Sequence, residues 1–352
     1  MGTNTRKFIV RLTADFNDDT GAPKFQDIGL SVLAGHSQIE PGALKQYCSP
    51  IAADQIEGAQ GVIVMTPKVA AQTVARSESL LVVARLGVGY DNIDVKACTA
   101  ANVLVTITTG AVDRPVAEAT IGWMIALSHN MRAKDELARA GRWNERFKPV
   151  SCELRERTLG VVGCGGIARK TIELLRGFGM NPPLAFDPFV KPETAASLGV
   201  RLVGLVELLG HADFVSIHCP LNEQTRGLIG PRELGLMKPG AFLLNTARGG
   251  IVDEDALHQA LKDRRIAGAA LDCFAQEPVT APSRFRELDN VLLAPHSIAW
   301  TDELFRDIGE AACQVMADLS LGRQPRGALN PELFERPAFR AKWERFQNPK
   351  AT

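Results

Sequence analysis

The fold of this chain is decided by residues 158–168, which read Thr158-Leu159-Gly160-Val161-Val162-Gly163-Cys164-Gly165-Gly166-Ile167-Ala168. A short apolar strand here enters a G-x-G-x-x-A turn, and a helical pattern follows. Gly163 permits a tight turn, and Gly165 lets a pyrophosphate approach the backbone N–H groups at the start of the helix, which attract anions. Together with Gly166 and Ile167, these residues predict a dinucleotide-binding turn. Taken alone, the glycine pattern is about as consistent with an ordinary turn as with a dinucleotide-binding turn.

An acidic residue stands where a dinucleotide site needs one. The next apolar run, Leu184-Ala185-Phe186, ends at Asp187, roughly 20 residues beyond the glycines. A carboxylate at this place accepts hydrogen bonds from the ribose hydroxyls of NAD and repels the 2′-phosphate of NADP. Pro188 and Phe189 follow, so no adjacent arginine can receive a phosphate. We therefore predict NAD as the cofactor, with a turn acid before proline as the alternative role for Asp187.

Three ionisable residues, Arg248, Glu277 and His296, each follow an apolar, strand-like run. Loops at the carboxyl ends of parallel strands converge, so we expect these distant residues to share one site. Arg248 has the planar fork that pairs with a carboxylate. Histidine holds and releases a proton near neutral pH, and Glu277 can orient the ring of His296 and stabilise its protonated form. The alternatives are a structural ion pair for Arg248, a structural role for His296, and a solvated turn position for Glu277.

A second glycine-rich loop, Gly87-Val88-Gly89, follows another strand-like run that ends near Arg85. The backbone amides of Gly87, Val88 and Gly89 can form an anion-binding nest for a substrate carboxylate, to which Arg85 adds positive charge. A loop that merely reverses the chain is the alternative.

Length, charge and cysteine use indicate the class of protein. The chain has 352 residues, more than the roughly 250–300 residues of a single core, so we expect two domains. Forty basic and forty acidic residues cancel, which argues against nucleic acid or anionic lipid as a partner. No apolar run reaches the length of a membrane span, and the polar start shows no secretory signal. Seven cysteines without metal-ligand spacing indicate reduced thiols in the cytoplasm, with neither disulfides nor a bound metal.

Apolar runs alternate with helical patterns along two regions of the chain. We therefore predict the α/β fold class, with two Rossmann-like, doubly wound parallel-sheet domains. Strands are expected at residues 8–12, 61–65, 80–84 and 103–107, and then near Gly160, Leu184, Phe214, Phe242, Ala267 and Val291. A long helix is expected to begin at Arg114, and another to span residues 302–321.

Six motifs together make the sequence resemble the NAD-dependent D-isomer-specific 2-hydroxyacid dehydrogenases over roughly residues 61–331. The motifs lie at residues 87–94, 163–168, 216–221, 244–250, 271–278 and 294–296, and they read GVGYDNID, GCGGIA, SIHCPL, LNTARGG, LDCFAQEP and APH.

The resemblance implies a particular domain organisation and cofactor site. A nucleotide-binding domain, residues 114–315, is expected to be inserted into a substrate-binding domain formed by residues 1–113 and 316–352. A homodimer is implied as well, using the arm after the long helix. By the same resemblance Asp272 holds the nicotinamide amide, while Cys219, Thr246 and Ala247 line the cofactor. Simple packing at the end of a strand is the alternative role for Cys219.

These expectations combine in an NAD-dependent oxidoreductase that interconverts a 2-hydroxy acid and its 2-keto acid. Arg248 would hold the substrate carboxylate, and the Glu277–His296 pair would transfer the proton. Candidate substrates are glyoxylate or hydroxypyruvate, 3-phosphoglycerate, and a larger sugar acid. An NAD(H)-sensing scaffold of the corepressor kind resembles the same family and remains the alternative. A Rossmann-type methyltransferase would have no use for these three side chains.

Bulky residues after His296 suggest a distinctive substrate pocket. Ile298 and Trp300 stand where the family often has smaller residues, and Arg114 opens the long helix. We hypothesise that Trp300 and Arg114 select among hydroxy acids. The alternatives are that Trp300 packs against the helix at residues 302–321 and that Arg114 is a solvated charge.

Overall fold

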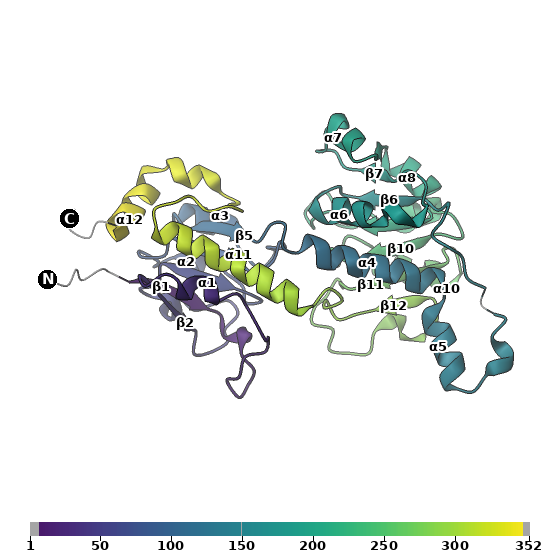
Figure 1. Cartoon of the computed structure of the whole chain (residues 1–352), viewed down its shortest axis with the longest axis horizontal. Coiled ribbons are helices and arrows are strands. Elements are labelled where there is room, and N and C mark those ends of the chain that lie inside the picture. Colours follow the sequence, from purple (N-terminus) through teal and green to yellow (C-terminus); the bar gives the residue numbers. More distant parts are fainter. Residues whose placement is uncertain (1–6, 149, 348–352) are drawn as a thin grey trace. The chain divides into compact units, whose positions relative to one another are not determined.

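The computed structural model describes residues 7–148 and 150–347. The chain divides into two compact units, residues 1–112 with 300–352 and residues 113–299. Each unit is an α/β domain with a parallel sheet of its own (Figure 1). The predicted fold class is therefore confirmed.

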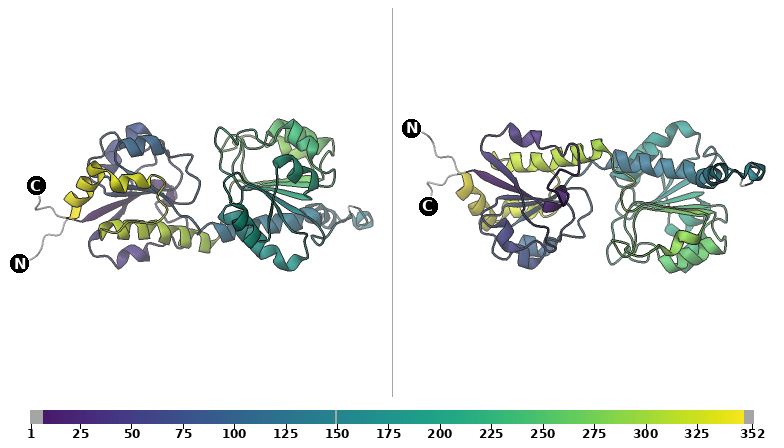
Figure 2. Two further views of the ribbon diagram at one scale, coloured as in Figure 1. Left: turned by 90° about the horizontal axis from the view of Figure 1, so that it is seen from above. Right: turned by 90° about the horizontal axis from the view of Figure 1, so that it is seen from below.

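The first unit is built on a five-stranded parallel sheet in the order β2-β1-β3-β4-β5. Its strands are β1 (Phe8–Leu12), β2 (Ile39–Ala43), β3 (Gly61–Val64), β4 (Val82–Arg85) and β5 (Leu104–Ile107). Its helices are α1 (Ser31–Ala34), α2 (Ala71–Val74), α3 (Val95–Ala100), α11 (Asp302–Ser320) and α12 (Pro337–Gln347), with 3-10 turns η1 (Ala14–Phe16), η2 (Ala53–Ile56) and η6 (Pro331–Glu335). Helices cover both faces of the sheet (Figure 2).

The second unit is built on a seven-stranded sheet in the order β12-β11-β10-β9-β6-β7-β8. Its strands are β6 (Leu159–Val162), β7 (Leu184–Phe186), β8 (Arg201–Leu202), β9 (Phe214–Ile217), β10 (Phe242–Asn245), β11 (Gly268–Leu271) and β12 (Val291–Leu293). Its helices are α4 (Asp113–Ser128), α5 (Met131–Arg139), α6 (Gly166–Leu174), α7 (Pro192–Ser197), α8 (Leu205–His211), α9 (Pro231–Leu236) and α10 (Glu254–Lys262), with 3-10 turns η3 (Trp143–Glu145), η4 (Leu175–Phe178) and η5 (Arg284–Glu287). The strand order reverses between β6 and β9, and ligands of open α/β sheets bind at such a switch point.

The second sheet is buried on both faces. Along β9, Phe214 belongs to the apolar cluster that contains Met124 of α4, whereas Val215 belongs to the cluster that contains Leu208 of α8. Strands covered on both sides have no polar face, so they read as continuous apolar runs. This is why the central strands are visible in the sequence.

The second domain boundary differs from the one that the sequence predicts. The chain re-enters the first unit at Trp300, before α11, and not at residue 316 within that helix. The reason is that α11 packs on the first unit along its whole length and buries Leu304, Ile308 and Met316 there. The first crossing lies between Val112 and Asp113.

Two strands, β2 and β8, are absent from the sequence prediction. Both lie at the edge of their sheets. β2 contains Pro41 and Gly42 and is largely exposed, and β8 has only two residues. Edge strands tolerate proline and lack a two-sided apolar pattern, so neither gives a clear signal. Among the described residues, no helix combines the length and apolar character needed to cross a membrane.

We expect Gly160→Ala to destabilise the second unit. An added Cβ would lie 2.7 Å from Leu208 Cδ2 and 2.9 Å from Ala212 Cβ, so α8 would have to move away from β6. Overpacking of this kind costs about 1–3 kcal/mol of unfolding free energy, which urea denaturation measures.

The matched control is Gly210→Ala in α8, where an added Cβ meets no atom within 4 Å. Alanine is favoured over glycine in helices by roughly 0.5–1 kcal/mol, so this variant should be slightly stabilised. A Gly160→Ala protein as stable as the parent would contradict the packing of α8 on β6.

Candidate active site

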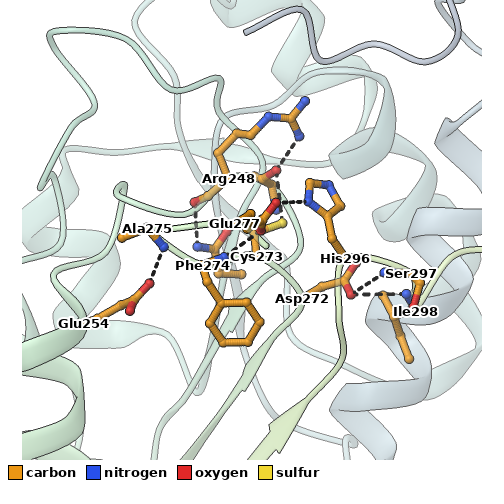
Figure 3. Close-up of polar contacts among 12 residues, drawn as sticks. Arg248, Glu254, Asp272, Cys273, Phe274, Ala275, Glu277, His296, Ser297 and Ile298 are labelled. Atoms are coloured by element: carbon orange, nitrogen blue, oxygen red, sulfur yellow. Dashed lines mark hydrogen bonds and ion pairs between the residues drawn. The ribbon is translucent and has the colours of Figure 1, made fainter. Parts of the chain in front are cut away.

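Three neighbouring strands carry the predicted catalytic residues to one edge of the second sheet. β10, β11 and β12 lie side by side and parallel. Arg248 comes just after β10, Glu277 lies in the loop after β11, and His296 follows β12. Figure 3 shows the three side chains grouped together. Residues separated by as many as 48 positions in the sequence therefore meet in one place, as loops at the carboxyl ends of parallel strands do.

Glu277 and His296 form a direct pair. Glu277 Oε2 lies 2.8 Å from His296 Nδ1, and Glu277 Oε1 accepts a hydrogen bond of 2.8 Å from the amide of Phe274. Burial opposes ionisation of Glu277. The hydrogen bonds from His296 and Phe274, together with the charges of His296 and Arg248, nevertheless hold its pKa below the ordinary value. Because this pKa is lowered, the ionised, paired form of Glu277 persists to lower pH than the ionised form of an ordinary glutamate, and it is lost as the pH falls through the lowered pKa.

The backbone at His296 is held in an unusual conformation. Its φ is +55°, in the left-handed region that few residues other than glycine adopt. Asp272, at the end of β11, accepts hydrogen bonds at Oδ1 from the amides of Ser297 (2.9 Å) and Ile298 (3.2 Å). Burial raises the pKa of Asp272, although these two hydrogen bonds act in the opposite direction. Asp272 therefore fixes the turn that presents His296.

Arg248 is positioned by the turn after β10. The buried Asn245 closes this turn, because its Nδ2 donates to Arg248 O (2.8 Å) and its Oδ1 accepts from Ala247 N (3.1 Å). The guanidinium Nη1 donates to Ala247 O at 2.6 Å. The next residue, Gly249, lies so close to the backbone of Phe274 that a Cβ could not be accommodated. This glycine brings the Arg248 turn against the loop of Glu277.

The glycine turn after β6 fits a dinucleotide. Gly163 has a φ of +91°, and a Cβ there would lie 2.7 Å from the amide nitrogen of Cys219, after β9. A Cβ on Gly165, by contrast, would meet no atom within 4 Å. The turn therefore offers open space directly before α6, which begins at Gly166 and carries Ile167 in its first turn. Backbone amides at such a helix start suit a pyrophosphate.

The other predicted cofactor residues lie at the same edge of the sheet. Asp187 accepts hydrogen bonds from the amides of Cys164 and Phe189, each of 2.8 Å, so its carboxylate lies beside the glycine turn. Cys219 is partly exposed, and burial raises the pKa of its thiol to about 11, which keeps it neutral. Thr246 Oγ1 lies 3.4 Å from Thr120 Oγ1 of α4, and Ala247 precedes Arg248 in the turn.

Asp113 lies at the glycine turn after β6, which the sequence does not predict. Its carboxylate lies so close to Gly166 that a side chain there would collide with it. Burial raises the pKa of Asp113, and Lys170 acts in the opposite direction. The only signal in the sequence is its place at the start of the long helix, and that place does not reveal contact with α6.

The predicted anion-binding loop of the first unit is only partly available. The amide of Gly87 donates to Thr108 Oγ1 at 2.9 Å, and Gly87 O accepts from the amide of Thr108 at 3.1 Å. The Gly87 amide is therefore already bonded, and the expected nest is reduced to Val88 and Gly89. Arg85 lies beneath this loop, with Nη1 2.9 Å from where a Cβ on Gly87 would stand.

Trp300 and Arg114 have structural surroundings. The ring of Trp300 lies edge-on to Phe305 of α11, with centroids 5.3 Å apart, and also edge-on to Phe25. Arg114 pairs with Glu118 one turn along α4, at 2.7 Å. These contacts favour the alternatives in which Trp300 packs on the helix and Arg114 is a surface charge.

Known proteins resemble this chain in sequence and in fold. Residues 121–297 match the family model described as D-isomer specific 2-hydroxyacid dehydrogenase, NAD binding domain. The chain is 37% identical to a D-3-phosphoglycerate dehydrogenase of Methanocaldococcus jannaschii over 280 residues. This matched region covers 79% of this chain and 53% of that protein. The chain is also 36% identical to a glyoxylate reductase of Korarchaeum cryptofilum over 277 residues, and this matched region covers 78% of this chain and 83% of that protein.

Among solved structures, the TT0316 protein of Thermus thermophilus matches with a TM-score of 0.79 and 28% identity, over 91% of this chain and 99% of that one. The chain spans about half the length of the phosphoglycerate dehydrogenases that it matches, but most of the length of the glyoxylate reductase. The family model covers half of the chain. The chain therefore belongs to the D-isomer specific 2-hydroxyacid dehydrogenase family, as its motifs predict.

Proposed function

We propose that this protein is an NAD-dependent oxidoreductase that interconverts a 2-hydroxy acid and its 2-keto acid. The observation that carries the proposal is the 2.8 Å pairing of Glu277 with His296 beside Arg248, within a domain of the NAD-binding family. The names of the relatives, phosphoglycerate dehydrogenase and glyoxylate reductase, support the same reaction class. The candidate substrates remain glyoxylate or hydroxypyruvate, 3-phosphoglycerate, and a larger sugar acid.

The three side chains divide the work of the reaction. Arg248 binds the substrate carboxylate through its planar guanidinium. Glu277 holds His296 Nδ1, which leaves Nε2 as the ring atom that gives a proton to the carbonyl oxygen in reduction and takes it back in oxidation. The ionised Glu277 stabilises the doubly protonated ring. Bound NADH supplies the hydride.

Two observations support NAD in preference to NADP. Asp187 places a negative charge beside the glycine turn, and its two oxygens are held by the amides of Cys164 and Phe189. Because both oxygens are hydrogen-bonded, the Asp187 carboxylate is held in place, and its charge would repel the 2′-phosphate of NADP. No arginine directly follows Asp187 in the sequence to offset this repulsion.

The arm after α4 supports a homodimer. α5 has no buried residue, and Trp143 (68%), Phe147 (70%) and Val150 (83%) are largely exposed. The guanidinium of Arg146 lies over the rings of Trp143 and Phe147, at 5.5 and 4.5 Å from their centroids, so both aromatics form one patch. Clustered exposed apolar side chains of this kind mark interaction sites. We propose a second copy of this chain as the partner, with small-molecule acids as the other ligands.

Replacing His296 by alanine should lower turnover by about 10²- to 10⁴-fold, the usual contribution of a positioned general acid. The assay is NADH oxidation with glyoxylate, hydroxypyruvate and a longer polar keto acid. NADH affinity, measured by fluorescence titration, should change little. His211→Ala on the exposed side of α8 is the control. Full turnover in His296→Ala would refute its role, and no turnover by the parent protein with any keto acid would favour the NAD(H)-sensing scaffold.

Asp187→Asn should narrow the preference for NADH over NADPH while keeping the shape of the side chain. Like charges about 4 Å apart repel by roughly 1–4 kcal/mol at effective dielectric constants of 80 and 20. The ratio of kcat/KM for the two cofactors should therefore fall at least about fivefold. A parent protein that uses both cofactors equally well would disprove the assignment.

The double variant Trp143→Ser, Phe147→Ser should shift the protein from dimer to monomer, because the aromatic patch of the arm is removed. Sedimentation velocity at several concentrations measures the change. Tyr47→Ser, which removes a 53% exposed aromatic from the first unit, is the control. A parent protein that is monomeric at all concentrations would rule out the dimer.

A further inference from the structure

Cys273 lies beside the Glu277–His296 pair, and its sulfur is drawn next to the Glu277 carboxylate in Figure 3. The sulfur, a carboxylate oxygen of Glu277 and a ring nitrogen of His296 all lie within 4.8 Å of one another. The three residues come from the loops after β11 and β12, all within residues 113–299. No metal-ligand spacing in the sequence marks this set, because the three positions meet only through the pairing of two strands.

We propose that Cys273, Glu277 and His296 form a binding site for Zn²⁺, and that the bound ion inhibits the enzyme by occupying the nitrogen through which Glu277 holds His296. The inhibition rests on the proposed function. The ion-binding site itself does not.

The chemistry of the three side chains fits this ion. Thiolate, imidazole and carboxylate are the ligand types that Zn²⁺ takes in proteins, and three protein ligands with a water in the fourth position are typical of open zinc sites. Mg²⁺ and Ca²⁺ prefer oxygen ligands, so a sulfur in the set selects against them. Ionised Cys273 and Glu277 would together balance the two positive charges of the ion.

The distances require only a small adjustment. Zinc bonds of about 2.0–2.3 Å at tetrahedral angles place ligand atoms about 3.4–3.6 Å apart. Glu277 Oε2 and His296 Nδ1 are now 2.8 Å apart and would separate by less than about 1 Å. The sulfur lies within 4.8 Å of a Glu277 oxygen and a His296 ring nitrogen, and it would approach them by at most about 1.4 Å. Rotation of three side chains on loops can supply such a shift.

Access and the present bonding of the thiol also permit ion binding. The side chains of His296 and Glu277 are 43% and 34% exposed, so an ion reaches them from solvent. Cys273 is buried, and its thiol donates a weak hydrogen bond of 3.4 Å to Ala247 O. On binding, the thiol loses its proton to solvent, and a neutral His296 ring keeps its single proton on Nε2.

A bound ion would stop the reaction for a definite reason. Nδ1 would be bonded to the metal, so the ring could no longer carry two protons. Keto-acid reduction needs that doubly protonated ring as its acid. Glu277 would be held by the ion and could no longer stabilise the charged ring.

The test measures ion binding separately from turnover. Protein freed of metal with a chelator is titrated with Zn²⁺ in competition with a chromophoric zinc indicator, and NADH oxidation is followed at the same Zn²⁺ concentrations. Co²⁺ is a spectroscopic substitute, because a sulfur ligand gives a thiolate-to-cobalt absorption band. Cys273→Val and Cys273→Ser remove the sulfur, and Cys48→Ser, at a partly exposed cysteine of the first unit, is the control.

We expect one Zn²⁺ per chain, with binding and inhibition sharing one midpoint. Both Cys273 variants should bind Zn²⁺ at least about tenfold more weakly and lose the cobalt band, while Cys48→Ser should match the parent protein. Mg²⁺ at the same concentrations should not inhibit. Equal Zn²⁺ affinity in the parent and in Cys273→Ser, or a cobalt band that survives in that variant, would overturn the site. If no keto acid is turned over, the proposed function fails, but the titration and the cobalt spectrum still decide whether the site exists.

Discussion

The loops at the carboxyl ends of the seven-stranded sheet can meet only because backbone segments approach each other closely there. At Gly163 the turn after β6 lies against the start of the Cys219 loop, and at Gly249 the turn after β10 lies against Phe274. A side chain at either place would push two loops apart. The first contact shapes the cofactor turn at the point where strand order reverses, and the second sets Arg248 beside Glu277. The turn after β6 and the placement of Arg248 beside Glu277 therefore both require glycine at an edge where the loops are crowded.

The same edge holds two carboxylates whose surroundings act in opposite directions. Asp272 is 5% exposed, and burial raises its pKa, yet it accepts two amides and so fixes the turn after His296. Glu277 lies nearer to solvent, and its hydrogen bonds and the neighbouring positive charges lower its pKa in spite of burial. Neighbouring carboxylates whose pKa values shift in opposite directions can take different tasks. Here Asp272 supports the turn, and Glu277 can carry the charge that acts on the ring.

Much of this arrangement could be predicted from sequence, because the central strands are buried on both faces and end at recognisable residues. The places of Arg248, Glu277 and His296 after such strands predict that the three side chains meet, and the structure brings them together. What depends on packing between distant segments could not be found. Nothing local shows that α11 belongs to the first unit, and nothing shows that Thr108 already holds the Gly87 amide. Cys273 reads as one more apolar residue after β11 until the loop that follows β12 is placed beside it.

Because α11 follows the second unit in the sequence but belongs to the first, the first unit cannot complete its fold before the second unit has been synthesised. All five of its strands, β1 to β5, have been synthesised by residue 107, but the sheet face that meets Met316 stays uncovered until α11 has been made. Residues 113–299 are continuous, so their core can close first. The nascent chain therefore carries an uncovered apolar sheet face through the whole synthesis of the second unit, and exposed apolar surface of this kind favours aggregation.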